Sequence, residues 1–344
     1  MLVCSGCNTT NHETDTVAQV QDEKQLEVTE SQTFEGQASS NEEATTEIFA
    51  MDTYITIKAY GKNADEAVSQ AQEKVERLDK QLSTGLAESE ISQLNADCGG
   101  TLSDEATYLM KRSLEICEST KNAFNPCMYP LMEAWGFTTK TYRIPEKNEL
   151  QQLLTLTDIQ QLTFDEQEKK VAFETQGMKL DFGGIAKGYT SAQIMEIFQN
   201  CGVESGMVSL GGNVQVLGNK IDGTPWRVGI QNPNTEEEYL GVLEVKDKAV
   251  ITSGGYERYF EADGNVYHHI IDPGTGYPAG NDLDSVTIVS TDGTLADGLS
   301  TALFVMGLEK AQEYWKNNRE AFDVILHTKS GQLYIQAQQT DLVV

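Results

Sequence analysis

The sequence predicts an α+β fold, because its strand and helix patterns are grouped rather than alternating one for one. In the second half, short β-rich segments follow one another across glycine turns, which is typical of hairpins and meanders. The helical periodicities occur in clusters, which disfavours a doubly wound parallel sheet. We therefore expect mostly antiparallel sheets with clustered helices, following a disordered N-terminal tail.

The first folded segments have clear boundaries. Residues 49–59 alternate apolar and polar side chains, which predicts one strand that ends at Gly61. Asn63 precedes apolar residues spaced by three or four, so it is expected to cap a helix that reaches Leu82. Ser89 and Ser103 are expected to begin two further helices.

The remaining elements follow in order. Helices are expected at residues 187–201, 295–306 and 309–317. Strands are expected at residues 206–210, 214–217, 226–230, 240–245, 249–252 and 285–289, on both sides of the Gly264 turn, and in a closing hairpin of residues 324–327 and 333–335.

The chain is strongly acidic, with 344 residues and a formal net charge of −28 at pH 7. Such a surface repels a phosphate backbone and anionic lipid headgroups, so nucleic acid is not expected as a partner. An anionic ligand would need a divalent cation and local N–H donors in order to bind. The charge therefore favours a metal-assisted site.

The N-terminus has the composition of an exported, tethered protein. Residues 2–7 end in small residues before a cysteine, which resembles a lipoprotein signal and predicts a lipid anchor at Cys7, with an unmodified tail cysteine as the alternative. Residues 8–47 hold ten acidic residues and one lysine, and few aliphatic ones, so they are expected to form a disordered tether. The predicted domains are residues 1–47 and 48–344. The predicted location is the outer face of a bacterial cytoplasmic membrane.

The other cysteines give no sign of a metal cluster. Cys98, Cys117, Cys127 and Cys201 are scattered, without a recurring Cys-x-x-Cys pair, so a zinc site is not expected. They are expected to be buried small apolar side chains, with a disulfide as the open alternative.

Residues 180–188, Leu-Asp-Phe-Gly-Gly-Ile-Ala-Lys-Gly, follow an expected apolar strand and open a helix. Adjacent glycines expose backbone N–H groups, and the helix N-terminus and Lys187 add positive charge. The segment therefore suits an anion such as a phosphate, although a simple tight turn remains an alternative. Residues 210–213 and 252–255 contain further Gly-Gly pairs, which taken alone are more typical of turns or bulges than of binding.

A second chemical segment is His-His-Ile-Ile-Asp-Pro-Gly-Thr-Gly at residues 268–276. Proline and glycine fix such a loop, and a histidine in it is suited to take a proton from a hydroxyl at neutral pH. The alternative is a histidine that only hydrogen-bonds a turn. His269 is the expected base.

A third segment is Ala-Asp-Gly-Leu-Ser-Thr at residues 296–301. Asp297 and Thr301 are four residues apart on an expected helix, so both side chains leave the same face. A carboxylate and a hydroxyl there suit a hard cation such as Mg²⁺, and helix capping is the alternative.

Together, these motifs resemble the ApbE family, the FAD:protein FMN transferases, from about Phe49 to the C-terminus. The resemblance implies a T-fold-like domain that uses FAD as substrate, Mg²⁺ as cofactor and an acceptor protein as partner. It implies that His269 and Asp297 are catalytic and that Thr190, Asp297 and Thr301 bind the metal. It also implies contacts with the flavin nucleotide at Met51, Ala123, Phe124, Asn125, Lys187, Gly211, Gly212, Ser253, Gly254, Ile271, Asp272 and Thr275.

Five positions depart from the family pattern: Asp52, Gly85, Asn125, Cys127 and Ala192. Asn125 replaces an Asp, so it keeps an acceptor oxygen and loses the charge. Gly85 replaces a frequent aromatic residue and puts one stacking contact in question. Trp135 and Phe137 are expected in the core.

The function implied is transfer of FMN from FAD to a Ser or Thr hydroxyl with release of AMP. Hydrolysis of FAD to FMN and AMP uses the same site and remains an alternative, as does a flavin-binding lipoprotein without catalysis.

Overall fold

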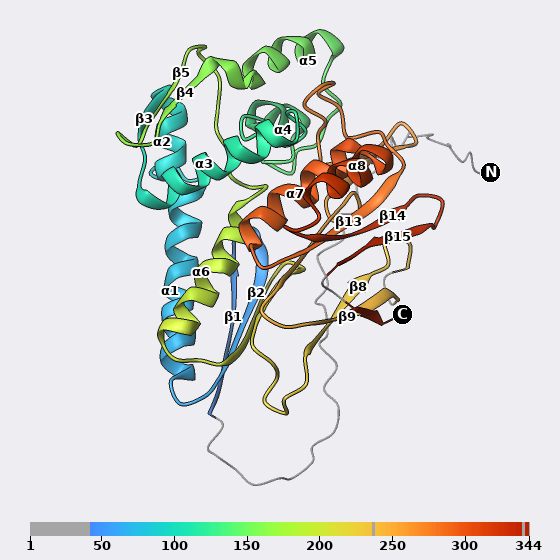
Figure 1. The fold of residues 1–344 in the computed structure, drawn as a ribbon. Helices are drawn as coiled ribbons and strands as arrows, with labels where there is room; N and C mark the ends of the chain where they lie inside the picture. Colours follow the sequence, from blue (N-terminus) through green and yellow to red (C-terminus); the bar gives the residue numbers. More distant parts are fainter. Residues whose placement is uncertain (1–41, 236–237, 339–340, 344) are drawn as a thin grey trace, which may run out of the picture.

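The computed structural model describes residues 42–235, 238–338 and 341–343; the expected lipid anchor at Cys7 and residues 1–41 of the expected tether lie outside them. An eight-stranded sheet in which all neighbours are antiparallel forms the centre of the molecule (Figure 1). In spatial order its strands are β1 (Glu43–Ala50), β2 (Thr53–Tyr60), β6 (Ser205–Leu210), β7 (Asn213–Leu217), β10 (Ala249–Gly254), β13 (Leu283–Ser290), β14 (Asp323–Thr328) and β15 (Leu333–Gln336).

Three small antiparallel sheets complete the described strands. They consist of β3 (Gly99–Thr101), β5 (Lys170–Phe173) and β4 (Leu162–Asp165); of β16 (Asp341–Val343), β9 (Tyr239–Val245) and β8 (Trp226–Gln231); and of β11 (Tyr259–Ala262) and β12 (Asn265–His268). The α+β prediction with mostly antiparallel sheets is confirmed.

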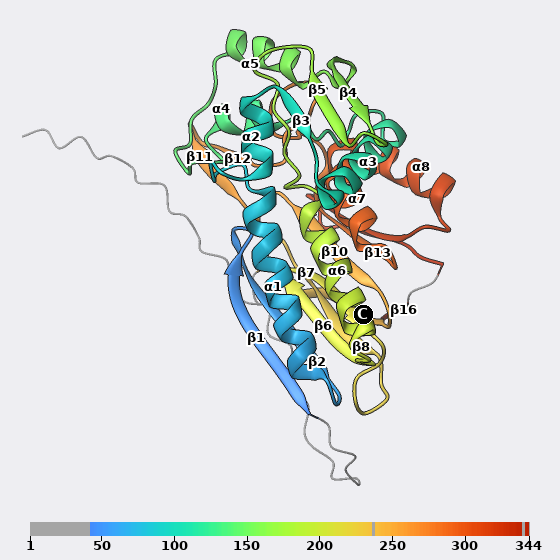
Figure 2. The same cartoon turned by 90° about the vertical axis from the view of Figure 1, so that its left-hand side faces the viewer.

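Helices cover one face of the large sheet. The described helices are α1 (Ala64–Leu82), α2 (Glu90–Ala96), α3 (Asp104–Ser119), α4 (Tyr129–Trp135), α5 (Lys147–Leu154), α6 (Ala186–Asn200), α7 (Gly293–Met306) and α8 (Leu308–Asn318), with two short 3₁₀ turns at Thr155–Thr157 and Ile159–Gln161. Helix α1 packs on β1 and β2, α6 on β6 and β7, and α7 on β10 and β13 (Figure 2). The opposite face packs against β8 and β9 through residues such as Val216, Trp226 and Ile325.

The helix starts agree with the predicted caps at two of three positions. Ser89 Oγ accepts from the N–H of Ser92 at 3.0 Å, and Ser103 Oγ accepts from that of Ala106 at 3.2 Å. Asn63 makes no side-chain cap; its amide donates instead to the carbonyl of Cys201 at 2.7 Å. Asn63 therefore ties the start of α1 to the end of α6.

The expected single strand at residues 49–59 is wrong. The chain reverses at Met51 and Asp52, whose φ values are +53° and +58°, and β1 pairs with β2 in the register Ala50↔Thr53. Two residues with positive φ match the right-handed twist of a hairpin, and Asp tolerates this region better than most residues do. Asp52 thus occupies the position of the family glycine within a tight turn.

Two other boundaries differ from expectation. Strand β1 begins at Glu43, so residues 43–47, which were assigned to the tether, pair with β2. No strand directly precedes the Gly-Gly segment, because β5 ends at Phe173 and residues 174–185 are turns and loops.

The cysteines and aromatic residues behave mainly as core components. The four cysteines in the described part of the chain are free thiols, and Cys117 and Cys127 are buried. Burial raises the pKa of Cys117 to about 11 and that of Cys127 to about 12, so both stay protonated. Trp135 and Phe137 are buried together as expected. Within the described residues, no helix combines the length and the apolar character that a membrane span requires.

Candidate functional site

Helices α6 and α7 touch at Gly188, and this contact joins two of the predicted motifs. The Gly188 N–H donates to Asp297 Oδ2 at 2.7 Å. A Cβ at Gly188 would lie 2.2 Å from the carbonyl oxygen of Gly293 and 2.6 Å from Cβ of Asp297. Only glycine therefore allows the helices to approach closely enough for this hydrogen bond.

Asp297 is almost fully buried, with 5% of its surface exposed. Its Oδ1 accepts from the side-chain amide of Asn213 at 3.1 Å, a contact that the sequence did not predict. Burial raises the pKa of Asp297 above the usual 3.8, while the charge of Lys187 and the N–H of Gly188 act in the opposite direction. A cation next to this carboxylate would favour its charged form.

His269 lies where the charge of Lys187 reaches it, so these two predicted residues belong to one region. Its Nδ1 is 3.2 Å from the carbonyl oxygen of Arg258. Because a carbonyl only accepts, Nδ1 carries the proton and Nε2 keeps a free lone pair. Desolvation, together with the charge of Arg258, holds the pKa of His269 well below 6.5, so the ring is a neutral base at pH 7.

Two charged residues of this region were not among the predicted site residues. Asp181 precedes the Gly-Gly pair, and its Oδ1 accepts from the N–H of Gly183 at 2.9 Å. Burial raises the pKa of Asp181, whereas Gly183 and Arg258 lower it. Arg258 thus acts on both Asp181 and His269 although it lies in no recognisable motif.

The β1–β2 turn reaches the same region. Thr190 Oγ1 lies 3.6 Å from Met51 Sδ, and it donates to the carbonyl of Ala186 at 2.8 Å. Gly211 and Gly212 form the β6–β7 turn, both with positive φ, and a Cβ on Gly211 would lie 2.2 Å from Thr53 Oγ1. The two hairpin turns therefore lie side by side.

Three hydroxyl groups lie close together one turn of α7 after Asp297. Ser253 Oγ lies 2.8 Å from Ser300 Oγ and 3.3 Å from Thr301 Oγ1. Gly254 follows Ser253, and a Cβ there would lie 2.2 Å from the Tyr256 ring. The predicted residues Ser253, Gly254 and Thr301 are thus neighbours.

The loop expected to line the flavin is fixed by Asn125. Its Oδ1 accepts from the N–H of Cys127 at 2.7 Å, and its Nδ2 donates to Asn122 Oδ1 at 2.9 Å and to the carbonyl of Thr157 at 2.8 Å. A carboxylate could not make the last two bonds. The adjacent Phe124 is buried, and its ring would lie 3.1 Å from a Cβ on Gly184; Ala123 is half-buried against the same core.

The loop after His269 is held mainly by its own contacts. Asp272 accepts from the N–H of Gly274 at 2.8 Å and from the hydroxyl of Thr275 at 3.2 Å. Ile271 is buried in the cluster that contains Trp135. These contacts stabilise the loop, and none of them joins Ile271, Asp272 or Thr275 to Asp297.

The oxygen donors of this site suit a hard cation that takes only a few of its ligands from the protein. The described residues contain no group of three His, Cys, Asp or Glu side chains that could hold a metal ion. Asp297 and the hydroxyls of Thr190 and Thr301 offer only oxygen, and the buried carboxylate gains from positive charge. Mg²⁺ accepts few protein oxygens when water and phosphate supply the rest.

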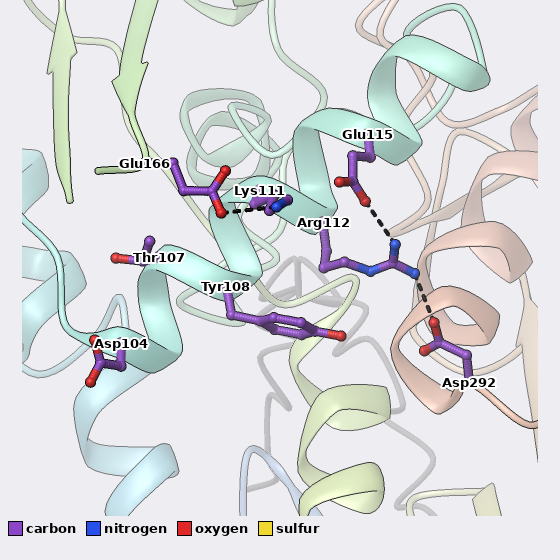
Figure 3. Close-up of a pocket in the computed structure, with 8 residues that line it drawn as sticks. All are labelled: Asp104, Thr107, Tyr108, Lys111, Arg112, Glu115, Glu166 and Asp292. Carbon is purple, nitrogen blue, oxygen red and sulfur yellow. Dashed lines mark hydrogen bonds and ion pairs between the residues drawn. The ribbon is translucent and has the colours of Figure 1, made fainter. Parts of the chain in front are cut away.

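A separate hollow lies over α3, and none of the predicted site residues lines it (Figure 3). In it Arg112 bridges Glu115 at 2.7 Å and Asp292 at 2.8 Å. Asp292 also accepts from the N–H of Leu295 at 2.9 Å and so caps α7. Arg112 therefore anchors the helix that carries Asp297.

A buried acid at a helix contact, the charge of Lys187 and a neutral histidine are groups that suit phosphate-ester chemistry. The same chain matches the model of the ApbE family over residues 51–326. The protein belongs to the ApbE family.

Similar proteins agree in sequence and in fold. A FAD:protein FMN transferase of Klebsiella pneumoniae is 34% identical over 294 residues, covering 84% of this chain and 90% of that protein. One of Treponema pallidum is 36% identical over 280 residues, covering 75% and 77%. The crystal structure of the ApbE protein of Thermotoga maritima gives a TM-score of 0.81 at 30% identity, covering 86% and 97%. The flavin transferase ApbE of Vibrio cholerae gives 0.78 at 28% identity, with the same coverage.

Proposed function

We propose that this protein transfers FMN from FAD to a Ser or Thr hydroxyl of an acceptor protein and releases AMP. The observation that carries the proposal is His269, whose Nδ1–H donates to the Arg258 carbonyl at 3.2 Å and so leaves the lone pair of Nε2 to accept a proton. Its relatives in Klebsiella and Treponema have the same activity by name.

In the transfer step, His269 Nε2 takes the proton of the acceptor hydroxyl. The hydroxyl oxygen then forms a bond to the FMN phosphorus, and the bond from that phosphorus to the bridging oxygen breaks. AMP leaves with the electron pair. Lys187 and Arg258 stabilise the negative charge of the phosphoryl oxygens.

Thr190, Asp297 and Thr301 would hold Mg²⁺ in this proposal. The ion would supply positive charge to the pyrophosphate oxygens. The raised pKa of Asp297 supports it, because burial without a cation disfavours the carboxylate.

FAD would lie near the N-terminal part of α6, in contact with the two hairpin turns and the loops described above. Met51 would pack against it as a soft apolar contact, and backbone N–H groups near Gly212 and Gly254 would face phosphates. Residues 123–125 would line the flavin side, and the rigid 271–275 loop would present backbone groups to the nucleotide.

Intact-mass spectrometry of an acceptor domain that a family relative flavinylates tests the proposal. Incubation with this protein, FAD and Mg²⁺ should add one FMN, and EDTA should abolish the addition. FAD converted to FMN and AMP with an unmodified acceptor would indicate hydrolysis instead. Bound but unconsumed FAD would indicate a flavin-binding protein without catalysis.

His269→Ala should lower the transfer rate by about 10²- to 10⁴-fold, because the hydroxyl loses its general base. The variant should still bind FAD, which flavin fluorescence measures independently of transfer. Transfer at the wild-type rate would exclude His269 as the base.

We further propose export and lipidation at Cys7, with the catalytic domain tethered outside the cytoplasmic membrane. The small residues before Cys7 and the acidic residues after it support this location. Cys7→Ser should move the protein from the membrane fraction to the soluble fraction and remove the lipid mass from the N-terminal peptide.

A further inference from the structure

Two aromatic side chains stand exposed at the edge of the large sheet. Phe49 and Tyr54 are 63% and 59% exposed, more than any other large hydrophobic residue of the described chain. They face each other across β1 and β2, with ring centroids 5.2 Å apart and the rings at 74° to each other. An exposed aromatic pair on one strand pair is typical of a binding surface.

The pair lies close to the proposed active site. Phe49 is two residues before Met51, whose Sδ lies 3.6 Å from Thr190 Oγ1 on α6. At about 3.3 Å per residue, the aromatic pair begins within about 10 Å of this contact. The rings project from the face of the sheet opposite to α1 and α6, because Ile55 and Ile57, which alternate with Tyr54 along β2, pack with those helices. A segment bound along β1 therefore reaches the site around the β1–β2 turn.

Within the part of the chain that the structure describes, the outer edge of strand β1 is unpaired. Among the described residues it pairs only with β2, and it is the outermost strand of the sheet (Figure 2). The two-residue turn makes Ala50 and Thr53 the hydrogen-bonded pair that closes the hairpin, so the N–H and C=O groups of Phe49 and Glu47 point away from β2. An extended segment can pair with these groups.

We infer that the outer edge of β1, together with Phe49 and Tyr54, binds the extended segment of the acceptor protein that flanks the modified hydroxyl. This inference rests on the proposed transfer to a protein hydroxyl. Pairing with β1 supplies affinity without sequence dependence, and the aromatic rings receive an apolar side chain.

The negative charge along β1 disfavours acidic segments as ligands of this edge. Glu43 and Glu47 lie exposed along β1. Residues 1–41 of this chain are rich in Asp and Glu, and a second copy also carries a net charge of −28, so both would be repelled. The acceptor segment is therefore expected to be neutral or basic.

The test compares the wild-type protein with Phe49→Ala/Tyr54→Ala. Binding of an acceptor domain that a family relative flavinylates is measured by interferometry on the His269→Ala background with FAD present, and transfer is measured on the active background. The double variant should weaken acceptor binding and lower kcat/KM for the acceptor by at least tenfold. FAD affinity should change less than twofold.

Two further variants separate this surface from general effects. Ile335→Ala changes an exposed apolar residue on β15, at the opposite edge of the same sheet, and should leave both readouts unchanged. Glu47→Pro removes an N–H that points away from β2 and should weaken acceptor binding, with an unchanged melting temperature as the control.

Unchanged acceptor binding in both the double variant and Glu47→Pro would overturn the inference. Binding that depends on the aromatic pair, with no FMN transfer by the active protein, would support the surface and contradict the transferase proposal. The two failures are thus distinguishable.

Discussion

Asn125 stands where the family pattern has an aspartate, and its hydrogen bonds give the substitution a structural meaning. Its amide group donates to two oxygens, Asn122 Oδ1 and the Thr157 carbonyl, while its own oxygen holds the N–H of Cys127. The amide thus links three parts of the loop expected to line the flavin. A charge at this position is not required for that role.

Asn125→Asp should lower the free energy of unfolding by about 2 to 4 kcal/mol, because two donors are lost and a buried charge faces oxygen atoms. Urea unfolding measures the change. Asn318→Asp, at an exposed helix end, is the matched control and should change stability by less than about 0.5 kcal/mol. Equal stability of Asn125→Asp and the wild type would contradict the role given to the amide.

His268 predicts a pH dependence of stability. Burial lowers its pKa to about 4, from the usual 6.5. Between these values the unfolded chain binds a proton that the folded chain does not, so stability falls as pH decreases through this range. His269, with its pKa also lowered, acts in the same direction.

His268→Gln should therefore make the decline of unfolding free energy below pH 6.5 shallower, by up to about 1.4 kcal/mol per pH unit. Urea unfolding at several pH values between 7 and 5 checks it. Identical slopes for the variant and the wild type would show that His268 does not titrate as its burial implies.

Among the elements, the α6–α7 contact has the strictest steric requirement. Gly188 and Gly293 face each other there, and Arg112 and Asp292 hold the start of α7 from the other side. Because Asp297 lies one turn into α7, the position of this helix sets the position of the carboxylate.

Gly188→Ala should destabilise the protein by about 1 to 3 kcal/mol through overpacking and should weaken Mg²⁺-dependent transfer, because Asp297 must move. Thermal unfolding and the Mg²⁺ dependence of the transfer rate give the two readouts. Gly280→Ala is the control, since no atom lies within 4 Å of the added Cβ. Wild-type stability and activity of Gly188→Ala would refute this account of the contact.

The elements that the sequence predicted well have strong local patterns. The strands between residues 205 and 336 alternate or are richly β-branched and are separated by glycine turns, and they occur where expected. The sequence does not predict β1 as a separate strand, because Glu43, Thr45 and Glu47 face solvent and its pattern resembles that of a polar tether. An edge strand that is buried on one face alone needs few apolar residues, so its sequence carries little hydrophobic periodicity.

The candidate site likewise contains residues that local motifs predict and residues that only the tertiary structure reveals. His269, Lys187 and Asp297 stand in recognisable motifs, and the fold brings them into one region. Asn213 and Arg258 were missed, because each acts through the tertiary structure: Asn213 by a hydrogen bond across 84 positions, and Arg258 by its charge and carbonyl. No local spacing marks such partners.

At the scale of the whole molecule, the net charge of −28 should slow the approach of anionic FAD. The association rate should rise when ionic strength increases from about 0.01 M to about 0.15 M, as the Debye length falls from about 30 Å to about 8 Å. Stopped-flow flavin fluorescence measures this rate. An association rate that falls with increasing salt would mean that the positive charges of Lys187 and Arg258 dominate the electrostatic field that FAD meets at the proposed site.

The order of strands in the large sheet also bears on how the chain assembles as it folds. Counted across the sheet, the strands follow their order in the chain from β1 to β15, so each newly made strand adds to one growing edge and none has to insert between two others. The N-terminal strands can thus pair with each other and pack against α1 and α6 before the C-terminal strands are in place. Asp297 and Thr301 come late in the chain, so the folding protein cannot form the proposed metal site until α7 has docked on β10 and β13.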